Sequence, residues 1–530
     1  MPPGQGSAPG GDLHLGAPSL PWRRVLDAAR CLVREPRAAV GVLSALLAGK
    51  RLRARQRFAA LVGIDHRLAI PAAILDRFPL DPAPALPDGI ALSGPGALVA
   101  GATSRIAAAF ADAGLQALYG DALVPASPDA VLPLLPPAFD PELLLSADYL
   151  GPLAYRRSAL PGGPPSCAAD AAFRIAERHG RSAIGHLPAV LSVRSAAPEP
   201  AREDGPAVHR AAVRTHLDRT GRAEARIAAE PDGMIRVAHP LPEAPLASVI
   251  VPTRDRLDLL RPCLDSLRAY TDWPALEILV CDNDSRESET LAYLRRLEGE
   301  GRGVVVPCPG PFNFAAMNNA AAMRARGRLL VFMNNDVEAF QPDWLTLMAR
   351  EALRPEIGAV GAKLLDDAGR IQHGGIVFGT GGLVTHGHRH FPGNAPGYLS
   401  ALRATHEVSA VTAACLAVEA DTFRAVGGFD AERFAVDFND VDLCLRLNAA
   451  GHRTLLVPAA VLHHREAASR RWTPQARARH EREIANLKNR WGPLLAQDPH
   501  YHPGFDPDLS THARLAKRFP AAGPVRRSSY

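Results

Sequence analysis

The fold of this chain is decided by the stretch Leu329-Leu330-Val331-Phe332-Met333-Asn334-Asn335-Asp336, in which five apolar residues run directly into three polar ones. An apolar run of this length is typical of a strand that is buried on both faces of a sheet. Open α/β sheets bind ligands beyond the carboxyl ends of such strands, so Asp336 is expected at a ligand site. A second acidic cluster, Asn439-Asp440-Val441-Asp442, follows about a hundred residues later. The two clusters suggest one active site assembled from distant parts of the chain.

Apolar strands and amphipathic helices alternate around this stretch. Strands are expected over 248–252, 277–281, 304–306 and 329–333, and helices over 257–269, 288–297 and 314–326. This order predicts an α/β domain with a mixed, mostly parallel sheet and helices on both faces. A further helix is expected to open at Asn439 and to end at the stop signal Ala449-Ala450-Gly451. The Gly-rich sequence beyond Gly358 predicts loops that build an acceptor site.

The chain is longer than one hydrophobic core usually allows. Its 530 residues predict two or three domains, and 47% hydrophobic with 22% charged residues indicates a globular protein. Breaks rich in proline and alanine at 197–205 and 240–245 are the best linker candidates. The expected divisions are a basic helical segment (1–65), a smaller α/β domain (66–196), a linker with short strands (197–245), the main α/β domain (246–472), a helix and tail that pack on it (473–510), and a basic, disordered tail (511–530).

Charge and cysteine content narrow the expected partners and compartment. The excess of 60 Lys and Arg over 55 Asp and Glu is too mild to indicate nucleic acid. Basic residues crowd both ends of the chain, which suits a peripheral contact with anionic lipid at the inner face of the plasma membrane, although a solvated charged face is the more common explanation.

Seven cysteines without a CxxC pair predict buried thiols of a reducing compartment. The aliphatic stretch 38–49 is too short to span a bilayer, so a cytoplasmic protein is expected.

Short polar residues also follow the strand expected at 277–281. The sequence Asp282-Asn283-Asp284-Ser285 can accept hydrogen bonds from a nucleotide base and bind a ribose hydroxyl. A helix-capping turn explains the same residues equally well.

The cluster that ends in Asp336 is more specific. A sugar nucleotide has a diphosphate leaving group whose charge must be neutralised, and a hard divalent cation such as Mg²⁺ or Mn²⁺, held by one carboxylate and phosphate oxygens, is the usual means. Asp336 is the candidate ligand. Its alternative is a solvated turn at the end of a strand.

The helix expected from Asn439 supplies a candidate general base. Transfer of a glycosyl group to an alcohol needs a base that accepts the hydroxyl proton, and Asp440 is our choice. Asp442 lies two residues further on, faces elsewhere on a helix, and is expected to be structural or a cap. An acidic first turn stabilised by the helix dipole is the alternative for both residues.

Histidines offer a third set of candidates. A neutral imidazole of the pair His463-His464 can complete the coordination of the same metal, and Arg470 can reach a phosphate. Such a histidine pair is more often an ordinary surface or core feature. A separate metal cluster of His373, His386 and their neighbours His388 and His390 is disfavoured, because the Gly-rich spacing without nearby acids or cysteines suits a flexible loop.

Together these residues resemble the family 2 glycosyltransferases, specifically the rhamnosyltransferase-like and O-antigen biosynthesis branch. The resemblance runs from Ser248 to about Pro503, roughly half of the chain. Its ordered motifs are Val251-Pro252-Thr253-Arg254-Asp255, Asp282-Asn283-Asp284-Ser285, Phe312-Asn313-Phe314 with Asn318-Asn319, Asn334-Asn335-Asp336, Val360-Gly361-Ala362-Lys363, Gln372-His373-Gly374-Gly375, Thr412-Ala413-Ala414-Cys415, Gly427-Gly428-Phe429-Asp430 and Asn439-Asp440-Val441-Asp442.

The resemblance implies a GT-A fold, a Rossmann-like α/β domain for nucleotide-diphosphate sugars, and inversion of the anomeric carbon by direct displacement. It also implies roles for the matching residues: nucleoside binding, the metal, the base and the diphosphate. Those residues are Thr253, Asp255, Asp282 and Asn283 for the nucleoside, Asn334 at the first position of a DxD-like motif, Asp336 and His464 for Mg or Mn, and Asp440 as base. One loop departs from the branch, since Ala467 and Arg471 stand where Ser and Gly are usual, which puts the role of the Arg470 loop in doubt.

The amino-terminal half resembles the second half of another such domain. The matching segments are 139–151 and 186–194. Tyr119-Gly120-Asp121-Ala122 stands where these domains have an acidic run, and no nucleotide-binding strand precedes it. A degenerate, non-catalytic GT-A-like region is therefore expected over 66–196.

The sequence thus predicts a metal-dependent inverting glycosyltransferase of cell-envelope polysaccharide biosynthesis. It would move a sugar, with a rhamnose-like sugar favoured, from a nucleotide-diphosphate donor to a growing surface polysaccharide or lipid-linked glycan. A nucleotidyltransferase is the alternative enzyme, but residues 252–256 lack its Gly-rich basic loop. A non-catalytic glycan-binding or scaffold protein is the alternative of another class, against which Asp336 and Asp440 count.

Overall fold

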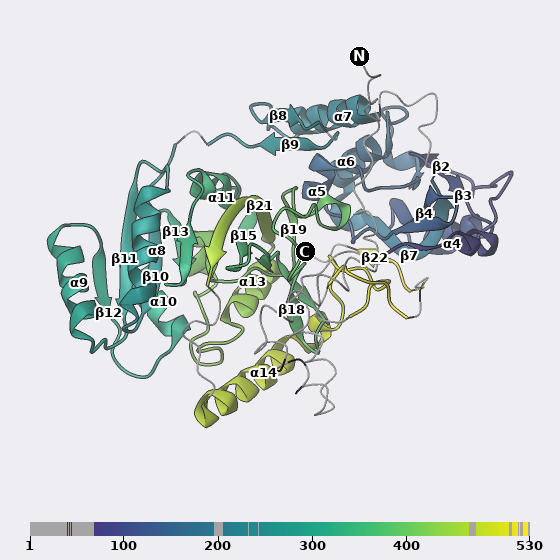
Figure 1. Ribbon diagram of the computed structural model, residues 1–530. Helices are drawn as coiled ribbons and strands as arrows, with labels where there is room; N and C mark the ends of the chain where they lie inside the picture. Colours follow the sequence, from purple (N-terminus) through teal and green to yellow (C-terminus); the bar gives the residue numbers. More distant parts are fainter. Residues whose placement is uncertain are drawn as a thin grey trace, which may run out of the picture.

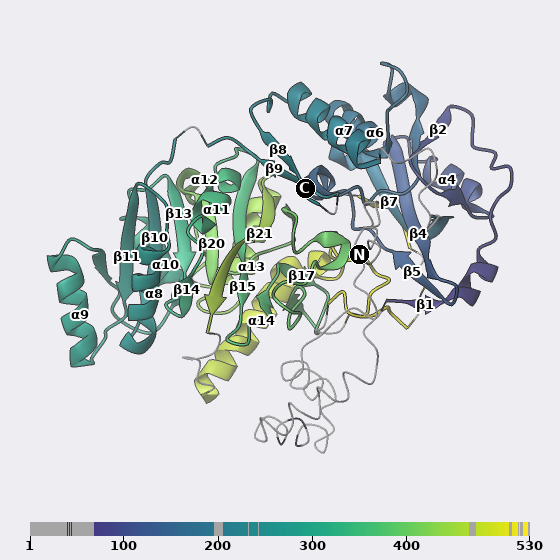
Figure 2. The same ribbon diagram turned by 45° about the horizontal axis from the view of Figure 1, so that its top comes forward.

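The chain forms two α/β units joined by a helix and a hairpin, as the computed structural model shows (Figures 1 and 2). The structure describes residues 68–194, 205–231, 233–241, 243–465, 473–507, 511–517, 519 and 523–527, with the isolated positions 40, 42 and 44. The expected basic helical segment 1–65 lies almost entirely outside the described residues. Within the described ranges, no helix combines the length and apolar character needed to cross a membrane.

The larger unit, here the central domain, is built on a mixed sheet of ten strands with the order β12-β11-β10-β13-β20-β15-β21-β14, to which β16 and β19 add at the side. Strands β10 to β13 run parallel, as do β15 and β21, and β20 is antiparallel to both of its neighbours. The strands are β10 (Ala247–Thr253), β11 (Leu276–Asp282), β12 (Val304–Pro307), β13 (Leu329–Met333), β14 (Val337–Ala339), β15 (Ile357–Leu365), β16 (Ile371–His373), β19 (His406–Glu407), β20 (Cys415–Glu419) and β21 (Arg453–His464).

Helices cover both faces of this sheet because its strands are apolar on both sides. Val249 and Val251 of β10 pack into one core and Ile250 into the other. The first core includes α8 (Leu257–Ala269), α9 (Ser288–Gly299) and α11 (Trp344–Ala352), and the second includes α10 (Phe314–Ala322), α12 (Ala420–Ala425), α13 (Asn439–Ala449) and α14 (Pro474–Leu495). The expected α/β architecture is confirmed.

One helix is shorter than expected. α10 ends at Ala322 rather than at 326. The chain turns there because Gly327 must lie against β10, where an added Cβ would meet the Ser248 Oγ at 2.5 Å. The Arg326 backbone N–H also donates to Glu277 Oε1, which holds the turn beside β11.

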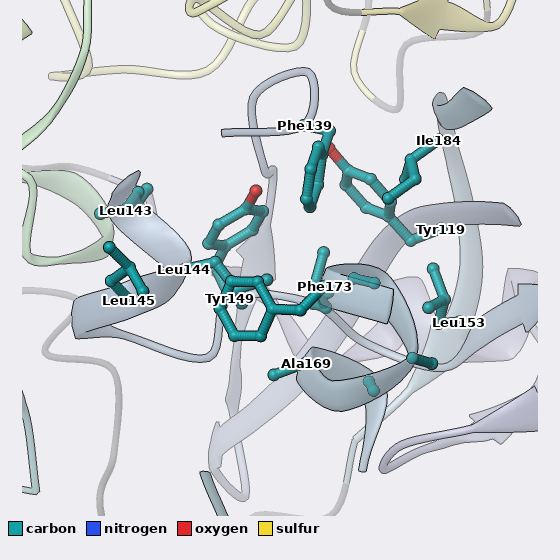
Figure 3. Close-up of a cluster of buried hydrophobic side chains, with 14 of the residues drawn as sticks. Tyr119, Phe139, Leu143, Leu144, Leu145, Tyr149, Leu153, Ala169, Phe173 and Ile184 are labelled. Carbon is teal, nitrogen blue, oxygen red and sulfur yellow. The ribbon is translucent and has the colours of Figure 1, made fainter. Parts of the chain in front are cut away.

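The smaller unit, here the amino-terminal domain, has its own eight-stranded sheet and core. Phe139, Tyr149 and Phe173 are fully buried among leucines from α5 and the strands (Figure 3). Its elements are β1 (Ile70–Pro71), β2 (Ile90–Ser93), β3 (Ala97–Leu98), α4 (Ala102–Ala109), β4 (Ala117–Ser127), β5 (Ala130–Leu134), α5 (Pro141–Ser146), β6 (Leu153–Arg156), α6 (Ala168–His179) and β7 (Ile184–Val193).

The two sheets share a strand arrangement. In the central domain β20 lies antiparallel between β13 and β15, and β15 runs parallel to β21. In the amino-terminal domain β6 lies antiparallel between β2 and β4, and β4 runs parallel to β7. Helix α13 connects β20 to β21 after α12, and α6 connects β6 to β7. Counterparts of β10, β11 and β12 do not occur among the described strands of the smaller domain.

The segment between the domains has more structure than a linker with short strands. The expected strands are present as the hairpin β8 (Arg226–Ala229) and β9 (Ile235–Ala238). They follow the helix α7 (Gly205–Arg219), which was not expected. Its buried face interleaves His209 and His216 with Ala212, Val213 and Leu217, and His216 stacks on Phe173 of α6 with ring centroids 4.2 Å apart. A helix that buries polar rings gives a weak apolar period.

Buried charges join the two domains. Glu142 of α5 accepts hydrogen bonds from Arg354 (2.6 and 3.1 Å) and from Arg453 (2.7 Å) of the central domain. Burial alone would raise the pKa of Glu142, but the two guanidinium groups outweigh it and hold that pKa well below its usual value. Arg181 pairs with Glu407 in the same network. The domains are thus fixed to each other by ion pairs that water does not screen.

The carboxyl-terminal tail extends this contact. The tail was expected to be disordered from 511, yet Arg526–Arg527 forms β22 and pairs antiparallel with β7 of the amino-terminal domain. The Arg526 guanidinium donates to the carbonyls of Asp498 and Tyr501, and Arg527 pairs with Asp112. These contacts are polar and join residues far apart in the sequence, so no local sequence pattern predicts them. The same contacts engage Arg526 and Arg527, two of the basic residues for which the sequence suggested a membrane contact.

Candidate functional site

The carboxyl ends of three neighbouring strands bring predicted site residues together. Thr253, the last residue of β10, lies opposite Asp282, the last residue of β11. Asn335, which follows β13, donates from its side chain to Thr253 Oγ1 (3.0 Å). Sequence reasoning assigned no role to Asn335, although the Asn334-Asn335-Asp336 spacing contained it. The edge of the sheet that binds ligands in α/β folds is therefore where these side chains meet.

Two of the predicted nucleoside residues hold the local backbone. The Asp255 carboxylate accepts from the backbone N–H groups of Arg286 (2.6 Å) and Glu287 (2.9 Å), directly before α9. The Asn283 side chain is buried and donates to the carbonyls of Cys308 (2.7 Å) and Gly310 (3.0 Å). These contacts give the loops at this edge a fixed shape, and no side chain of 282–285 caps α9, whose N-cap is Glu287.

Asp336 and His464 lie side by side. Val337 pairs with His464 across strands β14 and β21, which places the Asp336 carboxylate 3.3 Å from His464 Nε2. Both side chains are buried. Within the described residues, Asp336 Oδ1 has no hydrogen-bond partner.

The protonation of His464 fits a shared cation. An amide oxygen only accepts hydrogen bonds, so His464 Nδ1 donates to Gln372 Oε1 (3.1 Å), and neutral His464 has its lone pair on Nε2. A lone pair that faces a carboxylate oxygen is repulsive, and either a proton on Nε2 or a metal cation between the two atoms removes that repulsion. Adjacent ligands of an octahedral Mg²⁺ or Mn²⁺, each about 2.1 Å from the ion, lie about 3 Å apart, close to the observed separation. Asp336 and His464 are therefore suited to hold such an ion together.

The remaining candidates near this pair have different positions. Asn334 is half-buried, and its backbone N–H donates to the Ala414 carbonyl (3.1 Å). Arg470 lies outside the described residues. The neighbouring His463 faces away from the pair, with its ring against Phe340 at 4.4 Å between centroids.

Asp440 lies in the first turn of α13 and is half-buried. Its Oδ2 accepts from the Ala413 backbone N–H (3.1 Å) and its Oδ1 from that of Val441 (2.9 Å), while the Thr412 hydroxyl provides a further hydrogen bond. Burial raises the pKa of Asp440 above its ordinary value, and these hydrogen bonds offset only part of that rise. A carboxylate with a raised pKa binds a proton more readily, as a general base requires.

The loop 412–414 connects the two acidic clusters, a role that the sequence motif Thr412-Ala413-Ala414-Cys415 did not reveal. Ala413 donates to Asp440, while the Ala414 carbonyl accepts from Asn334. The structure thus brings the strand-end cluster and the helix-start cluster to one site. Any displacement of this loop would move both.

Asp442 is structural, as expected. It is fully buried and accepts from Arg446 Nε (2.8 Å) and from Trp491 Nε1 (2.9 Å) of α14. The side chain therefore fastens α14 to the helix that bears Asp440.

Asp442→Asn should destabilise the protein by about 1–3 kcal/mol, because it removes the charge that pairs with the partly buried Arg446. Urea unfolding measures the change. Asp421→Asn is the matched control, since its pair with Arg424 is exposed and should contribute less than about 1 kcal/mol. Equal losses for the two variants would contradict the assignment.

The Gly-rich region beyond 358 is a paired structure rather than a flexible loop. Strands β17 (Ile376–Phe378) and β18 (Val384–His386) form a hairpin against β16. Gly374 and Gly387 pack backbone to backbone, and an added Cβ on Gly387 would meet the Gly374 carbonyl oxygen at 2.5 Å. His373 and His386 are hydrogen-bonded to each other, Nδ1 to Nδ1, at 2.8 Å. The histidine metal cluster, which the sequence disfavoured, stays so, because a hydrogen bond between the two Nδ1 atoms leaves neither free for a cation.

Two other clusters have ligand-type side chains but do not suit a metal. Asp121 lies between His186 and His502, each 2.9 Å from Oδ1. His502 Nδ1 accepts from the Gly504 backbone N–H (2.8 Å), so its Nε2 bears the proton and donates to Asp121 instead of binding a cation. In the second cluster, Glu142, His239 and Glu351, the two carboxylates are already neutralised by Arg354.

The cysteines match the expectation of buried thiols. Cys263, Cys281, Cys415 and Cys444 are buried, and no disulfide occurs among the six described cysteines. Cys31 lies outside the described residues.

Comparison with known proteins covers the part of the central domain that contains Asp336. Residues 248–371 match the model of glycosyl transferase family 2. The chain is 40% identical to the uncharacterized protein y4gI of Sinorhizobium fredii (strain NBRC 101917 / NGR234) over 63% of its own length and 38% of the relative. It is 37% identical to the O-antigen biosynthesis protein RfbC of Myxococcus xanthus over 70% of its length and 30% of the relative. The chain therefore spans about a third of these relatives.

Among solved structures, the chain is similar to the mannosyltransferase PcManGT from Pyrobaculum calidifontis in complex with GDP-Man and Mn²⁺. The identity is 18%, the TM-score is 0.35, and the match covers 56% of this chain and 76% of the other.

Proposed function

Because residues 248–371 form a family 2 glycosyltransferase domain, we propose that this chain transfers a sugar from a nucleotide-diphosphate donor to a hydroxyl group of a glycan. The observation that carries the proposal is the pairing of the buried, cation-ready Asp336 and His464 with the half-buried base Asp440 through one loop. A metal site and a base at one sheet edge are what transfer from a diphosphate donor to an alcohol requires.

The proposed reaction is a single inverting displacement. Asp440 accepts the proton of the acceptor hydroxyl as its oxygen forms a bond to the anomeric carbon. The bond from that carbon to the diphosphate oxygen breaks on the opposite face, and the nucleoside diphosphate leaves. Asp336 and His464 would hold Mg²⁺ or Mn²⁺, which when bound neutralises the charge that develops on the diphosphate.

The nucleoside would occupy the edge formed by β10 and β11. Thr253 and Asp282 lie together there, and the shaped loops around Asp255 and Asn283 enclose the position. Asn334 would contact the diphosphate from the end of β13. Arg470 is proposed to reach the same diphosphate.

The amino-terminal domain is proposed to be a degenerate copy of the acceptor half. Aligning the sequences on the i,i+4 ion pairs Asp170–Arg174 of α6 and Asp442–Arg446 of α13 puts Ala168 at the position of Asp440. An alanine cannot act as a base. Without counterparts of β10 to β12, this domain would help to position acceptor or partner rather than catalyse transfer.

The proposed setting is synthesis of a surface polysaccharide or lipid-linked glycan, with a rhamnose-like sugar as the favoured donor group. The likeness to an O-antigen biosynthesis protein supports this setting. The reaction would take place in the cytoplasm, where nucleotide sugars are available, with the acceptor lipid at the inner face of the membrane.

Purified protein should release nucleoside diphosphate from at least one of the thymidine-, uridine- and guanosine-diphosphate sugars when Mg²⁺ or Mn²⁺ is present. A coupled assay for the released diphosphate measures this, and chelator should remove the activity. The Asp440→Asn variant serves as the blank. Turnover that is unchanged by chelator would contradict the metal assignment, and pyrophosphate release from nucleoside triphosphate and sugar phosphate would indicate a nucleotidyltransferase.

A further inference from the structure

A chain of hydrogen bonds leads from the Asp440 loop to His386. The Thr412 backbone N–H donates to His373 Nε2 (3.4 Å), and His373 Nδ1 lies 2.8 Å from His386 Nδ1. The two rings meet edge to face, with centroids 4.9 Å apart. Thr412 is also the residue whose hydroxyl hydrogen-bonds to Asp440.

The direction of this chain fixes both tautomers. His373 Nε2 accepts a hydrogen bond from a backbone N–H, so neutral His373 has its proton on Nδ1. His373 Nδ1 then donates to His386 Nδ1, which must be the acceptor. His386 is left with its proton on Nε2, directed away from His373.

The surroundings keep both imidazoles neutral and in place. Burial lowers the pKa of His373, and the nearby His386 and His464 lower it further; burial together with Arg389 lowers that of His386. The close contact of Gly374 and Gly387, the residues that follow the two histidines, fixes their backbones.

His386 therefore has one defined donor, its Nε2–H. His373 is fully buried, whereas His386 is half-buried, and the described residues provide no partner for its Nε2. The preceding residue on β16, Gln372, is the one that sets the tautomer of His464. Strand β16 thus orients both His464, the proposed metal ligand, and, through His373, His386.

We propose that His386 is an acceptor-binding residue, whose Nε2–H donates a hydrogen bond to a hydroxyl oxygen of the glycan that receives the sugar. The proposal rests on the proposed function. Its position favours the acceptor over the donor, because β18 is tied to the loop of the base, and the base must lie beside the acceptor hydroxyl. A neutral N–H group also suits a sugar hydroxyl better than a diphosphate, which would favour a cationic side chain.

The test separates transfer to an acceptor from hydrolysis of the donor by water. The probes are the octyl glycosides of rhamnose, mannose, glucose and galactose, with the donor and metal that the wild type uses. We expect His386→Ala to raise the KM of the accepted hexoside about fivefold to tenfold, the loss of one hydrogen bond, while donor KM and donor hydrolysis change less than about twofold.

Three further variants sharpen the result. His386→Gln retains an N–H donor and should lose less than His386→Ala. His373→Ala should resemble His386→Ala, because it frees the outer ring to choose its tautomer. His179→Ala, an exposed histidine on α6, is the control and should leave all constants unchanged.

Nitrogen-15 spectra of histidine-labelled protein provide a readout that needs no substrate. They should show neutral His373 protonated on Nδ1 and neutral His386 protonated on Nε2 at pH 7. An Nδ1-protonated His386, an unchanged hexoside KM in His386→Ala, or a donor KM that rises equally would overturn the proposal. So would a wild type that hydrolyses donor yet transfers to none of the four hexosides. A wild type that turns over no donor at all would overturn the proposed function instead, and the spectra would then decide the hydrogen-bond chain alone.

Discussion

Replacing Asp440 with asparagine should lower kcat for sugar transfer by about 10²–10⁴-fold, the usual contribution of a general base. Asparagine has nearly the same shape and can still accept the hydrogen bond from Ala413 N–H, but it cannot accept the proton of the acceptor hydroxyl. Steady-state kinetics with the donor identified in the screen measures the loss. Full activity in Asp440→Asn would show that another group is the base.

The pH profile gives an independent check. The base works only when deprotonated, and burial raises the pKa of Asp440, so activity should fall with decreasing pH at a value above that of an ordinary aspartate. The same rise makes the ionised carboxylate costly in the folded protein at neutral pH. Asp440→Asn removes that cost, so its melting temperature should not fall by more than about 2 °C. A large fall would mean that the lost activity reflects unfolding.

Replacing Asp336 with asparagine should reduce the rate of sugar transfer by at least about 10³-fold at standard metal concentration. The reason is that the Asp336–His464 pair loses its only carboxylate. The change also removes the repulsion between the carboxylate and the His464 lone pair. Because the variant lacks the anionic oxygen ligand, it should bind Mn²⁺ far more weakly, as paramagnetic line broadening or calorimetry will show.

Two controls separate this effect from a structural one. Raising the metal concentration should restore part of the activity of His464→Gln, which keeps a neutral ligand, but little of that of Asp336→Asn. Glu338→Gln tests a neighbouring carboxylate, which pairs with Arg465 and should leave metal affinity unchanged. Equal metal affinity in the wild type and Asp336→Asn would rule out Asp336 as a ligand.

The central domain follows from the sequence because its signals are local. The helix 257–269 and the strand 329–333 have the predicted bounds, and α13 opens at Asn439 and ends before Gly451 as expected. In each case an apolar period, a strand-end polar run or a stop signal lies within the element itself. The sequence offered an imidazole from the pair His463-His464 as a ligand of the metal at Asp336, and only the family resemblance singled out His464, since strands β14 and β21 are far apart in sequence.

The remaining features depend on contacts that no local pattern contains. In helix α7 two buried histidines, His209 and His216, interrupt the apolar set and weaken its period. The tail strand β22 is held by guanidinium groups and has no apolar pattern at all. The tautomers of His373 and His464 depend on partners from other strands. Glycines at 374 and 387 look like loop residues in sequence, yet they are required by close packing.

The tail also determines when the amino-terminal domain can be completed. His502 and Asp121 hydrogen-bond to each other although they are 381 positions apart, and β22 adds to β7 from still further along the chain. At ribosomal rates of about 5–20 residues per second, Asp121 waits roughly 20–80 s for that partner. During this interval a buried carboxylate lacks one of its donors and the edge of β7 is uncovered. The amino-terminal domain thus stays incomplete until residues 502–527 have been synthesised, and the uncovered edge of β7 is exposed to aggregation until then.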